Sequence, residues 1–270
     1  MALPRMKPQD GVAWITGASS GIGAAVALEL ARRGWTVAVT ARRLEALERL
    51  ARSAEKLPGR IVAHAGDVTD AQGMRDVTDA IESIHGPIAL AFLNAGIASG
   101  QGRAIDVETV ERVVGVNLLG VAKSFFAVQP RMIARRAGQV AVNASLVGYR
   151  GLPGAAAYGA AKAGAIYFCE SMRFDCEAAG IRLQLVNPGF IETPMTEGRR
   201  FPMPFLLTVE EGARRIVDGF ESGGFEITVP RRLAWILKVA RLLPYPVYFA
   251  LMSRFAERSG CGRFSRPGSW

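Results

Sequence analysis

The amino-acid sequence predicts an α/β protein in which helices cover both faces of one parallel β-sheet. Short apolar runs alternate along the chain with segments whose apolar residues recur at helical spacing, as in parallel sheets. The 270 residues are half hydrophobic and include 30 glycines, a composition typical of a globular protein with a sizeable core. No linker-like stretch divides the chain before residue 190, so we expect a single domain.

Six of the apolar runs are predicted to form strands. They are residues 12–16, 37–40, 61–65, 88–93, 139–143 and 182–187. The intervening segments, such as 23–33 and 44–53, carry apolar residues at helical spacing and are predicted helices. This order is that of a Rossmann-type, doubly wound sheet.

The loop after the first predicted strand is rich in glycine. It reads Thr-Gly-Ala-Ser-Ser-Gly-Ile-Gly over residues 16–23 and leads into a helix rich in Ala and Leu. Glycines permit a tight turn and close backbone approach, while the amides and dipole at a helix N-terminus favour an anionic pyrophosphate. Strand, loop and helix together predict dinucleotide binding.

Tyr158 and Lys162 are four residues apart and follow Ser145 in the sequence. On a helix, positions i and i+4 lie on one face, so the Lys162 ammonium can stand beside the Tyr158 phenol and lower its pKa from about 10. Such a phenol is a usable general acid and base near neutral pH. Taken alone, the pair could also be surface residues, and Ser145 an ordinary turn serine near Gly148.

Charge and cysteine content exclude several other classes. The formal net charge is +9, and from residue 225 onward eight Arg or Lys residues outnumber two Glu, which leaves +6 in that segment. No nucleic-acid-binding motif accompanies it, so we expect no nucleic-acid partner. Cys169, Cys176 and Cys261 are odd in number, the first two are two helical turns apart, and a reducing, cytoplasmic setting is favoured. Residues 1–10 contain no apolar run, so neither a signal peptide nor a membrane span is expected there.

Neither histidine has the context of a catalytic group. His64 is predicted to lie in a strand and His85 in a turn beside Gly86-Pro87. No cluster of Cys, His, Asp or Glu predicts a metal site.

With these motifs in this order, the chain resembles the short-chain dehydrogenase/reductase family over roughly residues 10–230. The matching motifs are the glycine loop at 16–23, Asp67-Val68, Asn94-Ala95-Gly96, Asn117, Ser145 with Tyr158-x-x-x-Lys162, and Asn187-Pro188-Gly189 with Thr193. The resemblance implies a nicotinamide cofactor that exchanges a hydride with an alcohol or carbonyl.

The resemblance also implies roles for individual residues. Tyr158 would exchange a proton with the substrate oxygen, Lys162 would lower the Tyr158 pKa and bind the nicotinamide ribose, Ser145 would hold the substrate oxygen, and Asn117 would fix a water. From its own context, Asn117 could instead bend or cap an apolar helix. The implied cofactor-binding residues are Gly17, Ser19, Ser20, Gly21, Ile22, Gly23, Arg42, Arg43, Asp67, Val68, Asn94, Ala95, Gly96, Tyr158, Lys162, Pro188, Gly189, Ile191 and Thr193.

The end of the second predicted strand bears on the choice of cofactor. Members of the family that bind NAD would place an acid near position 41 to accept from the ribose hydroxyls, whereas this chain has Ala41-Arg42-Arg43. Guanidinium groups pair well with a 2′-phosphate, so the sequence favours NADP (NADPH) over NAD. Alternatively, both arginines are solvated residues that open the next helix.

Residues 1–230 are expected to form the dinucleotide-binding catalytic domain, with a substrate lid near residues 190–210. Pro194, Pro202 and Pro204 make that segment irregular, and it would lie over the carboxyl ends of the strands, where ligands bind. The lid offers an apolar surface that predicts a lipophilic substrate. Its apolar residues are Phe201, Met203, Phe205, Leu206 and Leu207.

Residues 231–270 form a basic, apolar C-terminal extension. Two apolar pieces flanked by Arg are separated by Pro244-Tyr245-Pro246, and each is too short to span a bilayer. The extension is expected to pack on the domain as a pocket wall, to form a subunit interface, or to lie on a membrane surface as an amphipathic helix.

The sequence as a whole predicts a cytoplasmic, NADP-dependent oxidoreductase that interconverts an alcohol and a carbonyl on a lipophilic small molecule. We expect a homodimer or homotetramer, with peripheral membrane contact through the extension as one possibility. The alternative is a non-catalytic NADPH-binding sensor that signals through its basic C-terminal segment.

Overall fold

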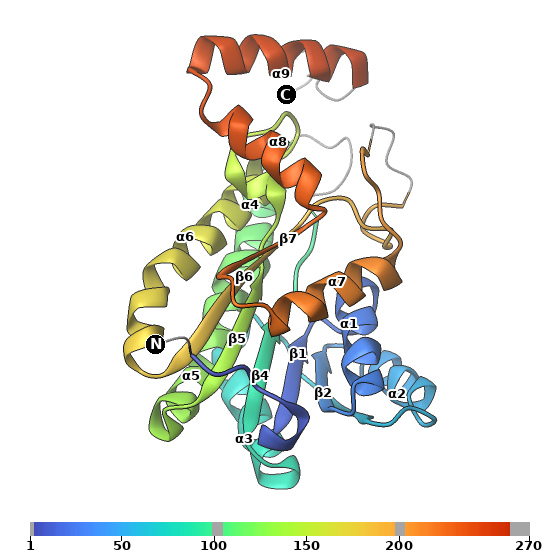
Figure 1. Ribbon diagram of the computed structural model, residues 1–270. Helices are drawn as coiled ribbons and strands as arrows, with labels where there is room; N and C mark the ends of the chain where they lie inside the picture. The colour runs from blue at the N-terminus through green and yellow to red at the C-terminus, as the bar shows by residue number, and fades with distance from the viewer. Residues whose placement is uncertain (1–2, 99–104, 198–202, 260–270) are drawn as a thin grey trace.

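The computed structural model describes residues 3–98, 105–197 and 203–259. Within them, seven parallel strands form one sheet in the order β3-β2-β1-β4-β5-β6-β7 (Figure 1). The strands are β1 (Val12–Thr16), β2 (Thr36–Ala41), β3 (Arg60–Ala65), β4 (Ile88–Leu93), β5 (Gly138–Asn143), β6 (Ile181–Pro188) and β7 (Glu226–Val229). The predicted α/β fold class, a Rossmann-type doubly wound sheet in a single domain, is confirmed.

Helices cover the two faces of the sheet (Figure 1). The described helices are α1 (Gly21–Arg32), α2 (Leu44–Ser53), α3 (Ala71–His85), α4 (Val107–Val114), α5 (Gly120–Arg135), α6 (Ala156–Ala178), α7 (Val209–Glu221), α8 (Arg231–Arg241) and α9 (Tyr245–Ser259). The last two lie beyond one end of the sheet (Figure 1). One apolar core joins α3, α5 and α6 to the sheet, and a second joins α1, α2 and α7 to its other face. Central strands buried on both faces explain why their sequences are continuous apolar runs.

The six predicted strands are all present, with ends that differ by at most one residue from the prediction. β7 was not predicted, because it has only four residues, follows Gly223-Gly224 and pairs with β6 alone. The prediction of a turn at His85 is wrong: the helical pattern of α3 continues through this residue and ends at Gly86, whose φ is +95°. Phe201, Pro202 and Cys261 lie outside the described residues.

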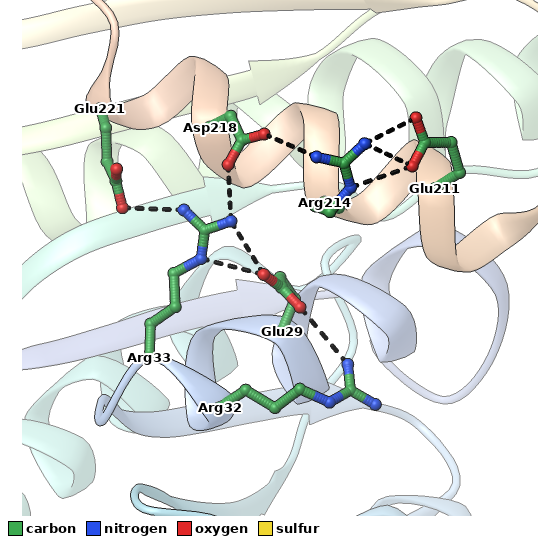
Figure 2. Close-up of polar contacts among 7 residues, drawn as sticks. All are labelled: Glu29, Arg32, Arg33, Glu211, Arg214, Asp218 and Glu221. Atoms are coloured by element: carbon green, nitrogen blue, oxygen red, sulfur yellow. Dashed lines mark hydrogen bonds and ion pairs between the residues drawn. The ribbon is translucent and has the colours of Figure 1, made fainter.

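Arg33, directly after α1, connects this helix to α7 on the same face of the sheet. Its guanidinium lies 2.8 Å from a carboxylate oxygen of Glu29, 2.6 Å from one of Asp218 and 2.9 Å from one of Glu221. Figure 2 shows the guanidinium between the three acids, whereas Arg214 pairs within α7 itself. Because α7 follows the segment 189–208, this network fixes the far end of that segment to the nucleotide-binding half.

Within the described ranges, one helical stretch, Val107–Arg135, is long and apolar enough to cross a membrane by length and composition. It comprises α4, α5 and the π-helical turn η2 (Gly115–Leu119) between them. This stretch packs against α3, α6 and strands β4 and β5, so packing inside the domain accounts for its apolar composition.

Candidate active site

A cleft of about 730 Å³ runs along the carboxyl ends of the strands. Its volume falls in the range of cofactor and ligand sites, and it lies where open parallel sheets bind ligands. The predicted site residues that line it are Gly17, Ser19, Ser20, Gly21, Ile22, Arg42, Arg43, Asp67, Val68, Asn94, Ala95, Gly96, Ser145, Tyr158, Lys162, Pro188, Gly189, Ile191 and Thr193. Gly23 and Asn117 lie behind the lining.

The glycine loop has the backbone conformation that its residues predict. Gly17 and Gly21 have φ of +68° and +59°, the left-handed region that favours glycine. A Cβ on Gly23 would stand 2.5 Å from Asn94 Nδ2 and 2.6 Å from the Gly17 carbonyl oxygen. Gly23 therefore allows close packing behind the loop and does not face the cleft, while the N-terminus of α1 does.

Asn94, directly after β4, holds the glycine loop through hydrogen bonds. Its Nδ2 donates to the carbonyl oxygens of Thr16 and Gly17, both at 3.1 Å. Its Oδ1 accepts a 2.9 Å hydrogen bond from Asn143 Nδ2, and the Thr16 hydroxyl accepts from the Asn94 amide at 3.0 Å. These bonds tie the ends of β1, β4 and β5 into one edge.

Two arginines and an aspartate lie at the β2 end of the cleft. Arg43 Nη2 lies 3.4 Å from the Ser19 hydroxyl, so its guanidinium stands over the glycine loop. Burial raises the pKa of the Asp67 carboxyl, but hydrogen bonds from Thr69 and the charge of Arg42 outweigh it and hold the pKa below its usual range. Asp67 is therefore a carboxylate, an acceptor near the two cations.

Lys162 and Tyr158 lie on α6, at the β5 end of the cleft. The Lys162 Nζ is 5.7 Å from the centre of the Tyr158 ring and donates a 2.6 Å hydrogen bond to the Asn143 carbonyl oxygen. Burial lowers the pKa of Lys162 to about 8. At neutral pH the group is mainly an ammonium, whose charge favours the phenolate of a neighbouring tyrosine.

Ser145 follows β5 and lies in the same part of the cleft. Its hydroxyl donates to the Pro188 carbonyl oxygen at 3.3 Å and accepts from the Val147 amide at 3.2 Å. The serine thus caps the short 3-10 helix η3 (Leu146–Tyr149), as a turn serine would, and also borders the cleft.

Asn117 is fully buried in the π-helical turn η2. Its side-chain amide donates to the Ile97 carbonyl oxygen and accepts from the Ile97 amide, both at 2.8 Å. A Cβ on Gly96 would stand 2.8 Å from Asn117 Oδ1 and 3.6 Å from Lys162 Nζ. The side chain therefore holds the loop at residues 96–97, where Gly96 lies close to Lys162.

Asn143 was not predicted as a site residue. Its carbonyl oxygen accepts from Lys162 and its side chain holds Asn94, while its own Oδ1 is buried without a hydrogen-bond partner among the described residues. Its position as a polar residue at the end of a mostly apolar strand was the available signal, since buried polar side chains normally form hydrogen bonds with a neighbour.

Apolar residues contribute to the lining of the cleft. Val147, Phe190 and Met195 contribute to it, together with Ile191 and Pro194. From the predicted lid, Met203, Phe205, Leu206 and Leu207 do not line the cleft; Phe205 and Leu206 are exposed at 43% and 38%.

Helix α8 of the C-terminal extension packs against Gly189, a residue of the cleft lining, without lining the cleft itself. None of the described residues of α8 and α9 lines the cleft, but a Cβ on Gly189 would stand 2.9 Å from a methyl carbon of Leu233 in α8. The carboxylate of Glu226 accepts hydrogen bonds from Tyr149, Lys238 and Asn187, the last at 2.7 Å. We call these four residues the Glu226 cluster; it joins α8 to the end of β6.

Among the described residues, no group of three or more His, Cys, Asp or Glu side chains could hold a metal ion. His64 and His85 face each other away from the cleft, with ring centres 5.4 Å apart. Cys169 and Cys176 are buried in α6 as free thiols.

A protein-family model described as short chain dehydrogenase matches residues 11–202. The chain belongs to the short-chain dehydrogenase/reductase family. An uncharacterized oxidoreductase of Myxococcus xanthus is 35% identical over 243 residues, which are 90% of this chain and 96% of the relative.

Solved structures agree with this family assignment. An alcohol dehydrogenase from Thermococcus sibiricus, complexed with 5-hydroxy-NADP, has a TM-score of 0.72 at 25% identity, over 80% of this chain and 94% of its own. A short chain dehydrogenase/reductase from Burkholderia phymatum, in complex with NAD, has a TM-score of 0.77 at 21% identity, over 86% and 94%. This short-chain dehydrogenase/reductase is therefore an oxidoreductase with a nicotinamide cofactor, NAD or NADP, and a small-molecule substrate.

Proposed function

We propose that the protein is an NADP-dependent oxidoreductase that interconverts an alcohol and a carbonyl on a lipophilic small molecule. The observation that carries the proposal is the shared cleft: Ser145, Tyr158 and Lys162 border one end, and Arg42 and Arg43 border the other. The glycine loop and the N-terminus of α1 lie between them, with donors suited to a pyrophosphate. The residues and the volume of the cleft fit a dinucleotide.

The proposed chemistry divides among the residues of the β5 end. The nicotinamide, when bound, supplies or accepts the hydride. Tyr158 gives its phenolic proton to the substrate oxygen during reduction and removes a proton during oxidation, and the Lys162 ammonium favours the phenolate that results. The Ser145 hydroxyl donates to the substrate oxygen as negative charge develops on it. Asn117 positions Lys162 through residues 96–97 and holds a water between Lys162 and solvent.

Replacement of Tyr158 by Phe tests this chemistry. Loss of the phenolic proton should reduce turnover by at least about two orders of magnitude and leave NADPH affinity close to that of the wild type. Tyr167→Phe is the matched control, because Tyr167 is on the same helix and 73% exposed. Full activity in Tyr158→Phe, with a panel of ketones and aldehydes and NADPH, would show that Tyr158 is not the proton donor.

The preference for NADP rests on the arginines after β2. Ala41 stands where an acid would bind ribose hydroxyls, Arg42 and Arg43 both line the cleft, and the Arg43 guanidinium lies beside Ser19. The alcohol dehydrogenase of Thermococcus sibiricus, complexed with 5-hydroxy-NADP, is consistent with this choice. We expect NADPH to bind roughly tenfold or more tightly than NADH, and Arg42→Asp to reverse the order.

A matched variant controls for the change of charge. Arg49→Asp, on the exposed side of α2 and outside the cleft lining, should keep the wild-type ratio of affinities. A wild type that binds NADH more tightly, or an unchanged ratio in Arg42→Asp, contradicts the preference for NADP.

A lipophilic substrate is supported by the apolar residues of the cleft lining. Val147, Phe190 and Met195 offer a surface of the kind that binds apolar groups. Across a series of ketones of increasing chain length, kcat/KM should rise, and Met195→Glu should reduce it most for the longest member. A flat series would favour a small polar substrate.

Self-association as a homodimer or homotetramer is the remaining part of the proposal. Four apolar side chains on neighbouring helices α5 and α6 are exposed: Phe126 at 50%, Ile133 at 42%, Tyr167 at 73% and Phe174 at 74%. Light scattering after gel filtration should give a multiple of the 28.9 kDa chain mass, reduced by Phe126→Glu with Phe174→Glu. A wild-type mass of one chain contradicts it.

A further inference from the structure

We propose that α8 and α9 bind the surface of a membrane that contains anionic lipids, and that they lie along it without crossing it. The inference is independent of the cofactor and substrate of the cleft. It rests on the outward face of α8, on the charges beside that face and on the way α9 is fixed.

The outward face of α8 is an apolar stripe. Its members recur at positions i, i+1, i+4 and i+7, so they share one side of the helix, while Leu233 and Ala234 pack on the domain from the opposite side. The four side chains are Trp235, Ile236, Val239 and Leu242, exposed at 69%, 55%, 61% and 83%. Contiguous exposed apolar surface of this kind marks an interaction site.

Basic residues surround the stripe. Arg231 and Arg232 precede it and are exposed, and Arg254 is exposed on α9. The acidic side chain described on these two helices is Glu257. The surface therefore combines apolar and positively charged groups, which matches the acyl boundary and the headgroups of an anionic leaflet.

Arg150 fixes α9 beside α8. Its Nη1 donates to the carbonyl oxygens of Ala240, Arg241 and Leu243 at 2.7–2.9 Å, where α8 ends. The guanidinium carbon lies 3.9 Å from the ring centre of Tyr248, and the Tyr248 hydroxyl donates to the Gly151 carbonyl oxygen at 2.7 Å. The two helices thus keep one arrangement at one end of the molecule (Figure 1).

α9 adds aromatic side chains to the surface. The rings of Tyr245 and Phe249 stack with centres 5.5 Å apart, and these side chains are exposed at 68% and 57%. Aromatic side chains with one apolar body and one polar tip are enriched at the boundary between lipid and water. With 11 and 15 residues, neither helix can span a bilayer, so both would lie in the interface.

The charges favour a lipid surface over a second copy of the chain. A twofold contact between two copies of the stripe would place Arg231 and Arg232 of both copies at one interface, where Glu257 is the acid described on these helices, and unpaired charges at an interface cost free energy. Anionic headgroups remove this cost. The loop after β6 and helix α8 after β7 also leave the same edge of the parallel sheet, so the cleft and the proposed membrane surface are at the same end of the sheet.

Vesicle sedimentation tests the proposal on the full-length protein. At low salt we expect binding to vesicles of phosphatidylcholine with phosphatidylglycerol and much weaker binding to phosphatidylcholine alone. Arg231→Gln with Arg232→Gln should lower the partition coefficient by more than about tenfold, because each arginine near the lipid surface contributes about fivefold. Trp235→Ser with Leu242→Ser should abolish binding, because it removes two apolar side chains of the stripe. Both side chains are exposed, so their loss leaves the domain folded.

Two control variants have the same chemistry at other places. Arg49→Gln with Arg52→Gln removes two exposed arginines from α2, and Ile84→Ser removes an apolar side chain of α3 that is 67% exposed. Both should bind vesicles as the wild type does. Equal losses in the control and test variants would show that overall charge or nonspecific hydrophobic adsorption, and not this surface, causes binding.

Tryptophan fluorescence locates the contact. Trp14 and Trp35 are buried, at 0% and 5% exposure, whereas Trp235 is exposed; Trp270→Phe removes the fourth tryptophan. In that background, anionic vesicles should shift the emission to shorter wavelength, and lipids with brominated acyl chains should quench it. No binding to anionic vesicles, or no response of Trp235, overturns the proposal. So does a loss of dimer mass, without any vesicle binding, when Trp235 and Leu242 are replaced.

Discussion

The Nζ of Lys162 donates a 2.6 Å hydrogen bond to the backbone carbonyl oxygen of Asn143. This bond joins α6 to the end of β5, two residues before Ser145. It fixes the Lys162 ammonium next to Tyr158 without a carboxylate partner among the residues that the structure describes, so that its charge remains available to the phenol. The same burial that fixes the ammonium lowers its pKa to about 8.

The buried Lys162 should make the stability of the protein depend on pH. Its folded-state pKa of about 8 lies below the ordinary 10.5, so between these values the unfolded chain binds more protons and the free energy of unfolding rises with pH. The full effect is about 3 kcal/mol. Lys162→Met should lack this rise, seen as a changing difference from the wild type in urea unfolding between pH 7 and about pH 10 without cofactor.

Only the difference in the free energy of unfolding between Lys162→Met and the wild type isolates the effect of Lys162, because other groups titrate in the same pH range. Burial raises the pKa of Cys176 to about 11, which acts in the opposite direction above pH 9. Lys56→Met, at an exposed position, should keep a constant difference from the wild type. A constant difference for Lys162→Met as well would mean that Lys162 is not a buried ammonium.

Gly96→Ala should disturb the catalytic end of the cleft. The added methyl group would stand 2.8 Å from Asn117 Oδ1, and that amide is held by two hydrogen bonds to Ile97. Overpacking of this kind costs about 1–3 kcal/mol, measured by urea unfolding, and the shift of Asn117 and Lys162 should lower kcat more than it changes NADPH affinity.

Gly115→Ala is the control for Gly96→Ala. A Cβ on Gly115 would meet no atom within 4 Å, and its backbone is already helical. It should stabilise the protein by up to about 1 kcal/mol. If Gly96→Ala were as stable as the wild type and fully active, the close packing of Gly96 against Asn117 would not be needed to position Lys162.

Glu226→Gln should destabilise the protein at neutral pH. Burial raises the pKa of Glu226, but hydrogen bonds from Lys238, Tyr149 and Asn187 outweigh it and hold the pKa below 4.5. A depressed pKa contributes stability above the unfolded value and loses it as pH falls through the folded value. The variant should therefore be less stable by about 1–3 kcal/mol at pH 7, with a difference that shrinks below pH 4.5.

Glu48→Gln, exposed on α2, gives the comparison for Glu226→Gln in urea unfolding at each pH. It should differ little from the wild type throughout. A loss in Glu226→Gln that did not change with pH would indicate a packing defect and not the loss of a carboxylate.

Arg33→Met should weaken the connection between α1 and α7. It leaves Glu29, Asp218 and Glu221 without the guanidinium between them (Figure 2). The Arg33 side chain is only 25% exposed, so the loss should be about 1–2 kcal/mol in urea unfolding and smaller at high salt. Arg214→Met, 55% exposed and paired within α7, should cost less than about 0.5 kcal/mol. Equal losses for the two arginines would contradict the special role of Arg33.

The sequence was sufficient to predict six of the seven described strands, and most of the predicted site residues line the cleft. Buried parallel strands must be continuous apolar runs, which made β1 and β4 readable to the residue, and the turn at Gly17 can be formed easily only by glycine. Residues at strand ends and at i, i+4 converge because the topology places them at one edge, so Ser145, Tyr158 and Lys162 could be chosen together.

The remaining features depend on contacts between distant segments. The role of Asn143 comes from its backbone carbonyl, which no side-chain pattern reveals, and the π-helical turn at Asn117 depends on its pairing with Ile97. The Glu226 cluster brings together four elements, η3, β6, β7 and α8, whose sequences give no sign of one another. β7 itself is too short and too polar at Glu226 to read as a buried strand.

Glu226 makes the outer helix and the cleft thermodynamically linked. Lys238 of α8 and Asn187 bind the same carboxylate, and Leu233 packs against Gly189 two residues beyond Asn187. A displacement of α8 must break these contacts or carry the strand end with it. A ligand that moved α8 together with this strand end would change the affinity of the cleft for its cofactor, and the cofactor would change the affinity of α8 for that ligand by the same factor.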